Sequence, residues 1–293
     1  TSDVKKVGPE ALQKLGLKTS LRFATNATFE PFEYYQNGKI VGIDVDVANA
    51  IGDVMGVDVE ILDMEFDAII TSVQAGKADA GIAGITVTPE RKKNIGFTDS
   101  YADVRQVIMK YRKTGKFKLG FLTLLLGVLF VACGSGASDA DRQIKSKTDL
   151  KGAVIGVQLG TTSDGLATEL EKEGGGTKVE RYNKGTDAIQ ALLQGKIDCM
   201  VTDEAPAKAF QRVNPSLRIL PETFDASSFA ICVAKDHAEL QQSINHAIRI
   251  LKENGVIDSI VNRHLERGIA VAYTPKTSDV KKVGPEALQK LGL

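Results

Sequence analysis

The chain has 293 residues, and its 37 basic and 37 acidic side chains give a formal net charge of zero. A neutral chain has little non-specific attraction to nucleic acid or to anionic lipid, so we expect no nucleic-acid partner. The length allows about two domains of roughly 100 to 150 residues each. A composition of 43% hydrophobic and 25% charged residues excludes the disordered and fibrous classes.

The cysteines and histidines show no metal-binding pattern. Three cysteines are too few and too scattered for a disulfide scaffold, and neither a CxxC pair nor a His/Cys spacing suits zinc. We therefore expect neither a metal site nor a cofactor. Cys199 and Cys232 have apolar neighbours in expected strands, which favours two buried thiols. The histidines lie among charged helical neighbours and are expected to be solvated: His237, His246 and His264.

Residues 1–17 (TSDVKKVGPEALQKLGL) recur without change as residues 277–293. A unit of this length that occurs only twice, at opposite ends, does not fit a solenoid repeat. We interpret the two copies as appended tails, or as an artefact of how the chain was put together, and we place the second tail at 273–293.

A basic stretch at 110–118 is followed by an apolar run at 119–132 and then by Cys133 among small residues. This order resembles a bacterial lipoprotein signal, in which the cysteine is lipidated. The run of roughly 14 apolar residues is too short to span a hydrocarbon core, which needs about 20. Because such a signal acts at an N-terminus, we interpret it as displaced. Cys133 would be lipidated only in an exported parent protein, either periplasmic or anchored at the cell surface. A buried core helix is the alternative.

Short β-branched runs alternate with helical periodicity along most of the chain. Strands are expected at 21–25, 57–62, 78–85, 154–157 and 178–182, and helices at 44–55, at 67–75, from Pro89 after the N-cap Thr88, and from the turn at 160–164. Alternation of this kind is typical of an α/β fold with a mostly parallel sheet.

Residues 67–79 and 187–198 have similar sequences, DAII…QAGKAD and DAIQ…QGKID, about 120 positions apart. Each is expected to form a helix, a glycine C-cap and a buried strand. Two similar lobes follow, and ligands of such sheets bind at the carboxyl ends of strands.

Complementary groups follow the expected strand ends. Arg91 offers a planar fork that suits a carboxylate, and the Gly-Thr-Thr turn at 160–162 offers backbone N–H groups at a helix N-terminus. Asp203 offers the opposite charge for an ammonium, and Phe29 and Phe66 offer rings for a side chain. Taken singly, the arginine could be solvated and the rings could belong to the core. Together they predict a pocket for an α-amino acid.

Seven runs occur in a characteristic order: 24–33 (ATNATFEPFE), 41–46 (VGIDVD), 83–91 (AGITVTPER), 97–101 (FTDSY), 149–152 (DLKG), 156–162 (GVQLGTT) and 198–204 (DCMVTDE). In order and spacing, residues 18–272 resemble the polar amino acid solute-binding proteins of ABC importers, apart from the insert. The resemblance implies a periplasmic-binding-protein type II fold, in which two α/β lobes are joined by crossover strands near 103–110 and 227–234. The implied division is 18–107 for lobe 1, 108–144 for the insert, 145–228 for lobe 2 and 229–272 for the return to lobe 1, whose helices begin near 236.

The resemblance also implies a function and a site. The protein would be a monomer, not an enzyme, that closes on a free L-amino acid outside the cytoplasm and delivers it to a membrane ABC permease. Nine residues would contact the ligand. Its carboxylate would be held by Arg91 and the Thr162 backbone, and its ammonium by Asp203, Thr86 and the Gly84 carbonyl. Its side chain would lie between Phe29 and Phe66, with its polar end in contact with Asn26 and, from the other lobe, with Gln158.

Two positions bear on specificity. Lysine and histidine binders of this family usually carry Asp where this chain has Asn26, so a carboxylate for a cationic side chain is missing unless Glu30 replaces it. Glutamine-type binders often carry Lys where this chain has Gln158. Glutamine and arginine remain, because a neutral amide suits Asn26 and Gln158 while a guanidinium can stack on Phe29 and Phe66.

Two other functions fit the same scaffold. An ionotropic glutamate receptor-like ligand domain is interrupted at the same place, but its pore needs several membrane segments and this chain has one short apolar run. A cyclohexadienyl dehydratase-like lyase would need an acid or base in the cleft, for which Glu30 is the candidate. Amino acid binding is the interpretation we favour.

Overall fold

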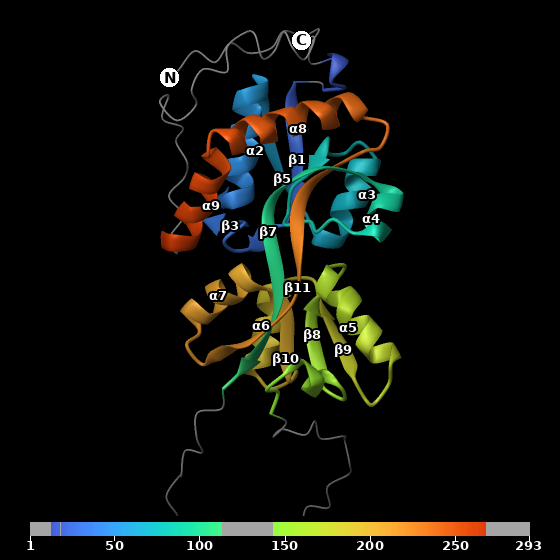
Figure 1. The fold of residues 1–293 in the computed structure, drawn as a ribbon, viewed down its shortest axis with the longest axis vertical. Coiled ribbons are helices and arrows are strands. Elements are labelled where there is room, and N and C mark those ends of the chain that lie inside the picture. The colour runs from blue at the N-terminus through green and yellow to red at the C-terminus, as the bar shows by residue number, and fades with distance from the viewer. Residues whose placement is uncertain (1–12, 18, 113–142, 268–293) are drawn as a thin grey trace, which may run out of the picture.

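The computed structural model describes residues 13–17, 19–112 and 143–267, and it is a two-lobed α/β fold (Figure 1). Two long strands, β7 (Gly96–Tyr111) and β11 (Leu217–Val233), pair antiparallel and run through both lobes. They connect the lobes into one sheet of eight strands in the order β5-β1-β6-β11-β7-β10-β8-β9. This confirms the predicted fold class.

Lobe 1 contains the strands and helices on one side of this connection (Figure 1). Its members are β1 (Ser20–Thr25), β5 (Asp58–Asp63), β6 (Ala80–Gly81), a small sheet of β2 (Thr28–Phe29), β3 (Glu33–Gln36) and β4 (Lys39–Val41), and the helices α2 (Ile43–Met55), α3 (Ile69–Gln74), α4 (Pro89–Asn94), α8 (Ala238–Glu253) and α9 (Val256–Arg267). The strand β1 pairs parallel with both β5 and β6.

Lobe 2 repeats this arrangement on a smaller scale. Its members are β8 (Val154–Gln158), β9 (Lys178–Tyr182), β10 (Cys199–Asp203), α5 (Thr162–Lys172), α6 (Gly185–Leu193) and α7 (Glu204–Val213). The strand β8 lies parallel to β9 and β10. The predicted boundaries at 107 and 228 stay predictions, because both positions fall inside the long strands that the lobes share.

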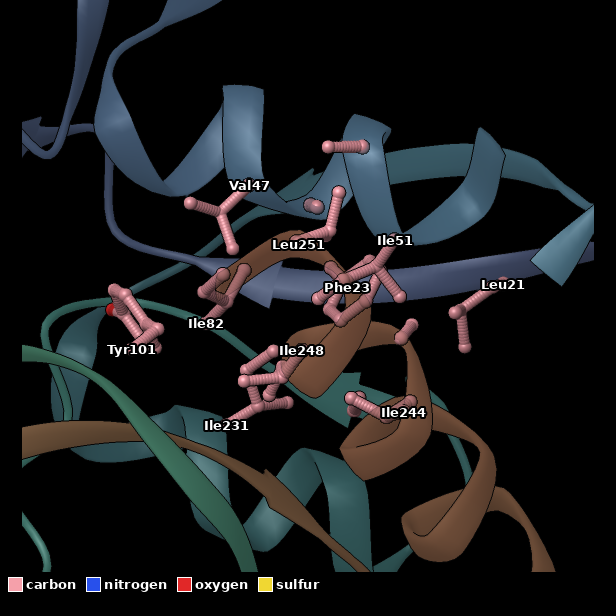
Figure 2. Close-up of a cluster of buried hydrophobic side chains, with 14 of the residues drawn as sticks. Leu21, Phe23, Val47, Ile51, Ile82, Tyr101, Ile231, Ile244, Ile248 and Leu251 are labelled. Atoms are coloured by element: carbon pink, nitrogen blue, oxygen red, sulfur yellow. The ribbon is translucent and has the colours of Figure 1, made fainter. Parts of the chain in front are cut away.

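The core of lobe 1 is formed where α2 and α8 pack on the sheet (Figure 2). Val47 and Ile51 are four residues apart on α2 and therefore share the face that contacts β1, where Phe23 is fully buried. Ile244 and Ile248 repeat the spacing on α8. Fully burying such side chains contributes roughly 1.5 to 3 kcal/mol each, which fixes the strand ends that carry the site.

In lobe 2 both faces of the sheet are buried. Met200 contacts one apolar cluster, while Cys199 and Val201 contact another, as the two-residue period of a strand requires. The helices α6 and α7 pack on the first cluster and α5 on the second. Cys199 in this lobe and Cys232 in lobe 1 are both buried, which confirms the expectation of two buried thiols.

Two local predictions are wrong. The strand predicted at 78–85 is only the two-residue β6, because Gly84 adopts a left-handed φ of 54° and the chain turns toward Thr86, which bridges to Phe229. His264 was expected to be solvated, but it is 3% exposed and its Nε2 lies 2.8 Å from an Asp46 carboxylate oxygen. Helical periodicity shows that α9 has a buried face, but it does not show that a carboxylate of α2 packs against that face.

The structure describes only parts of the predicted tails and insert. Leu15 and Leu17, at the end of the first copy of the repeat, are buried in the lobe 1 core. Residues 108–111, assigned by the sequence to the insert, belong to β7, and Lys110 Nζ donates to the Ile144 carbonyl at 2.6 Å. Cys133, its apolar run and the second copy lie outside the described residues. Among the described helices, none is long and apolar enough to cross a membrane.

Candidate ligand-binding site

A cavity lies between the lobes, at the carboxyl ends of β1 and β8. All nine residues predicted from the sequence line it, together with three others. Lobe 1 contributes Asn26, Phe29, Glu33, Phe66, Ala83, Gly84, Thr86 and Arg91, and lobe 2 contributes Gln158, Thr161, Thr162 and Asp203. A cavity between two lobes that is lined by aromatic rings and by converging polar and charged groups is typical of a small-molecule site.

Arg91 is held at the start of α4 by the predicted N-cap. The Thr88 hydroxyl accepts a hydrogen bond from the Arg91 backbone N–H at 3.1 Å, which fixes the first turn. The guanidinium lies over the Phe66 ring at 5.5 Å and donates through Nη1 to the Thr86 carbonyl at 2.8 Å. Burial lowers the pKa of Arg91. Only some of its five N–H donors are used by these contacts, so others remain for a ligand carboxylate.

Asp203 ends β10, directly before α7, and is a buried carboxyl group with an unsatisfied oxygen. Its Oδ1 has no hydrogen-bond partner among the described residues. Burial raises the pKa of Asp203 to about 7, although the positive charge of Arg91 acts in the opposite direction. A buried acceptor without a donor is costly, and an ammonium group in the cavity would satisfy it.

Asn26 and Gln158 hydrogen-bond to each other across the cleft. Gln158 Nε2 donates to Asn26 Oδ1 at 2.9 Å and to the Asn183 carbonyl at 3.0 Å. Asn26 Nδ2 in turn donates to the Met64 carbonyl at 2.8 Å. Because these amides already serve one another, a ligand amide would have to compete for them. The predicted contacts of Asn26 and Gln158 with a ligand remain predictions.

The two aromatic residues occupy different surroundings. Phe29 packs against Phe32, with ring centroids 5.7 Å apart, and against Phe229 at 6.4 Å. Phe66 instead carries the Arg91 guanidinium on its ring. Both line the cavity, but their contact with two faces of one side chain remains a prediction.

Gly84 and Thr162 are positioned by backbone and hydroxyl contacts. The Gly84 N–H donates to Asp44 Oδ2 at 2.7 Å, and a Cβ at this glycine would lie 2.9 Å from the Phe29 ring. The Thr162 hydroxyl accepts from Gln106 Nε2 at 2.7 Å. Thr162 begins α5, so the helix N-terminus faces the cavity, where backbone N–H groups favour an anion.

Glu33 is the residue that sequence reasoning missed. It is fully buried, lines the cavity, and forms no ion pair with a basic side chain in the described part of the chain. Burial, and then the nearby Asp44, raise the pKa of Glu33 well above its usual value. The proposed replacement carboxylate, Glu30, is instead half-exposed and pairs with Arg212 of lobe 2 at 3.2 Å. The signal was the alternation of β3, which turns Glu33 inward opposite Phe29.

A two-lobed α/β fold with a polar cavity between its lobes defines a protein that binds a small molecule there. The chain belongs to the bacterial extracellular solute-binding proteins, family 3, whose family model matches residues 21–267. The predicted family resemblance is therefore confirmed.

Three proteins of known ligand or origin are similar to this chain. The arginine-binding extracellular protein ArtP of Bacillus subtilis is 29% identical over 246 residues, which are 83% of this chain and 85% of that protein. Structures of an ancestral arginine-binding protein, one bound to arginine and one to glutamine, are each 37% identical, cover 84% of this chain and 98% of the other, and give TM-scores of 0.71 and 0.70. The ancestral amino acid-binding protein AncCDT-1, a precursor of cyclohexadienyl dehydratase, is 28% identical with a TM-score of 0.70 over 87% and 98% of the two chains.

Proposed function

We propose that this protein binds free L-arginine between its lobes outside the cytoplasm and delivers it to the membrane permease of an ABC importer. The observation that carries the proposal is Glu33, a fully buried carboxyl group that lines the cavity and pairs with no basic side chain among the described residues. A guanidinium has five N–H donors and suits a carboxylate through two parallel hydrogen bonds.

The charges of arginine match those of the cavity one to one. Arg91 and the N-terminus of α5 would hold the α-carboxylate, and Asp203, aided by Thr86 and the Gly84 carbonyl, would hold the α-ammonium. Glu33 would hold the guanidinium against the Phe29 ring, since Phe29 and Glu33 are directly paired on β2 and β3 and share a face. Glutamine would leave one buried carboxylate without a cation, which is costly.

The curated relative above is an arginine-binding protein, which supports this ligand. The ancestral arginine-binding protein was solved with arginine and also with glutamine, so it supports an amino acid ligand without separating these two. The same relatives favour a binding protein over a receptor-like ligand domain. The permease partner, the monomeric state and a Cys133 lipid anchor in the parent protein are part of the proposal.

The test is isothermal titration of the purified, ligand-stripped protein with arginine, glutamine, lysine, histidine and glutamate. Arginine should bind most tightly near neutral pH, and Glu33→Gln should weaken arginine at least tenfold, a loss of about 1.4 kcal/mol. Equal arginine affinity in this variant and the parent would disprove the assignment.

We also propose that the protein is not an enzyme. Glu30, the candidate acid or base of the lyase alternative, pairs with Arg212 and does not line the cavity. Glu33 does line it, but we assign this carboxyl group to the ligand side chain. Incubation with prephenate or arogenate should give no turnover, whereas product formation would revive the alternative.

A further inference from the structure

Glu33 belongs to a cluster of buried acidic side chains. Glu33 on β3 and Asp44 on α2 are both fully buried, and neither forms an ion pair in the described part of the chain. Asp44 accepts hydrogen bonds from the Tyr101 hydroxyl of β7 at 2.9 Å and from the Gly84 N–H at 2.7 Å. Asp63 of β5 is the other acidic group that faces Glu33.

Two carboxyl groups in one dry space cannot both be ionised at little cost, because each loses its hydration and repels the other. When the cavity is empty, the pair therefore keeps a proton at a pH where an exposed carboxyl group would have lost it. Burial raises the pKa of Asp44 to about 6, although the bonds from Gly84 and Tyr101 oppose the shift. A side-chain hydrogen bond between the two carboxyl groups also lowers the pKa of Asp44 and raises that of Glu33. These bonds favour the ionised form of Asp44, so we assign the proton of the pair to Glu33.

The two forms of Glu33 complement different ligand groups. An ionised carboxylate only accepts hydrogen bonds and carries the charge that a guanidinium needs, since a guanidinium has donors and no acceptor. A protonated carboxyl group both donates and accepts, which matches the carbonyl and NH₂ of a carboxamide. An ionised Glu33 beside a carboxamide would be a buried charge without a counter-ion, and a protonated Glu33 beside a guanidinium would leave a buried cation unpaired.

We propose that Glu33 recognises two classes of amino acid side chain in its two protonation states, guanidinium when ionised and carboxamide when protonated, so that pH sets the selectivity between arginine and glutamine. The inference rests on the proposed function. A carboxamide was expected to contact Asn26 and Gln158, but these two residues are already bonded to each other. The inference instead assigns recognition of both ligand types to Glu33.

The selectivity has a defined pH dependence. Binding of arginine would release one proton that binding of glutamine retains, so the ratio of the two association constants should rise up to tenfold per pH unit. Asp203 also has a raised pKa, but it faces the α-ammonium that both ligands share. Its titration therefore changes both affinities alike and cancels in their ratio.

The experiment is titration of the stripped protein with arginine and with glutamine at several values from about pH 5.5 to about pH 8. We expect the arginine-to-glutamine ratio to increase at least thirtyfold, about 2 kcal/mol, across this range. Glu33→Gln, whose amide imitates the protonated acid, should fix the ratio at its low-pH value and remove the pH dependence. Glu30→Gln removes a nearby carboxylate that does not line the cavity, and this variant should keep the pH dependence of the ratio.

A second measurement uses the unaltered protein and does not depend on any variant folding. Binding enthalpies in buffers of different ionisation enthalpy report protons released, and arginine should release about one more proton than glutamine near pH 6. If both ligands bind with a ratio and a proton release that do not depend on pH, the inference is wrong while the binding function stands. If neither ligand binds at any pH, the proposed function itself fails.

Discussion

Gln158 at the end of β8 donates a hydrogen bond to Asn26, which directly follows β1, with 2.9 Å between the two side-chain atoms, and so joins the lobes at the cavity wall. Two further contacts cross the same cleft. Arg91 Nη2 donates to the Gly160 carbonyl at 2.9 Å, and Arg212 of α7 pairs with Glu30 at 3.2 Å. The lobes are thus in direct contact, and any contact that exists only in this arrangement stabilises the state that encloses a ligand.

The Arg212–Glu30 ion pair is the contact that can be removed without touching the cavity. Arg212→Gln should weaken arginine binding by a factor of about 1.4 to 5, because a partly exposed pair contributes roughly 0.2 to 1 kcal/mol. The loss should appear mainly as faster ligand release, and it should shrink at high salt, which screens exposed charges. Stopped-flow release and titration at two salt concentrations measure both effects.

Lys208→Gln is the matched control for this change. Lys208 pairs with Glu204 at 2.6 Å within α7, so the variant removes an ion pair of the same helix that does not cross the cleft. Its arginine affinity should equal that of the parent. An equal loss in both variants would show that α7 itself, rather than the contact between lobes, determines affinity.

Arg91 is predicted to be indispensable for binding. Arg91→Ala would leave the ligand carboxylate buried without its counter-ion and would also remove the bond to Gly160, so affinity should fall by about 2 to 5 kcal/mol. Titration calorimetry checks the affinity, and thermal unfolding checks that the variant folds.

Lys92→Ala is the control, since Lys92 is the exposed neighbour on the same helix. It should bind arginine as the parent does. Unchanged binding in Arg91→Ala would mean that the ligand carboxylate is held elsewhere.

The sequence predicted elements whose signals are local. Thr88 and Pro89 indicate the start of α4, and the continuous apolar run at the start of β10 indicates a strand buried on both faces. It did not predict properties that depend on distant segments. Glu30 and Glu33 look equivalent in one short run, yet one pairs with Arg212 on another lobe and the other is enclosed with Asp44. Burial of each depends on packing that the run itself does not encode.

Gly84 is predicted to be irreplaceable for a steric reason. A side chain there would meet the Phe29 ring at 2.9 Å and the Phe229 ring at 3.1 Å, in a backbone conformation with a φ of 54° that L-residues rarely adopt. Gly84→Ala should therefore destabilise the protein by about 2 to 4 kcal/mol and displace Phe29 from the cavity wall, with loss of arginine affinity. Chemical denaturation and titration measure the two effects.

Gly76→Ala separates the backbone cost from the steric cost. Gly76 also has a positive φ, 67°, but a Cβ there would have no atom within 4 Å. This variant should lose only about 1 kcal/mol and should keep its affinity. Equal losses in the two variants would place the whole cost of Gly84→Ala in the backbone.

Asp203 is predicted to lower the stability of the ligand-free protein at neutral pH, although it is needed to bind the ligand ammonium. Burial raises its pKa from 3.8 to about 7, so between these values the unfolded chain has released a proton that the folded protein retains. The unfolded state then binds fewer protons, and stability must fall as pH rises from about 4 to about 7. Asp203→Asn removes this dependence. Near pH 7.5 the free energy of unfolding of the variant should therefore exceed that of the ligand-free parent by on the order of 2 kcal/mol, and near pH 4 by much less. Denaturant unfolding measures the difference.

Binding should respond to the same group with the opposite sign. Because the ligand ammonium needs an ionised Asp203, the arginine affinity of the parent should fall by up to tenfold for each pH unit below about 7 from this group alone. Asp203→Asn should bind arginine weakly at every pH, since the ammonium would be buried without its counter-ion. A variant that lost binding but gained no stability at neutral pH would show that the carboxylate of the empty protein is satisfied in solution. The cavity would then hold a cation or ordered water before the ligand arrives.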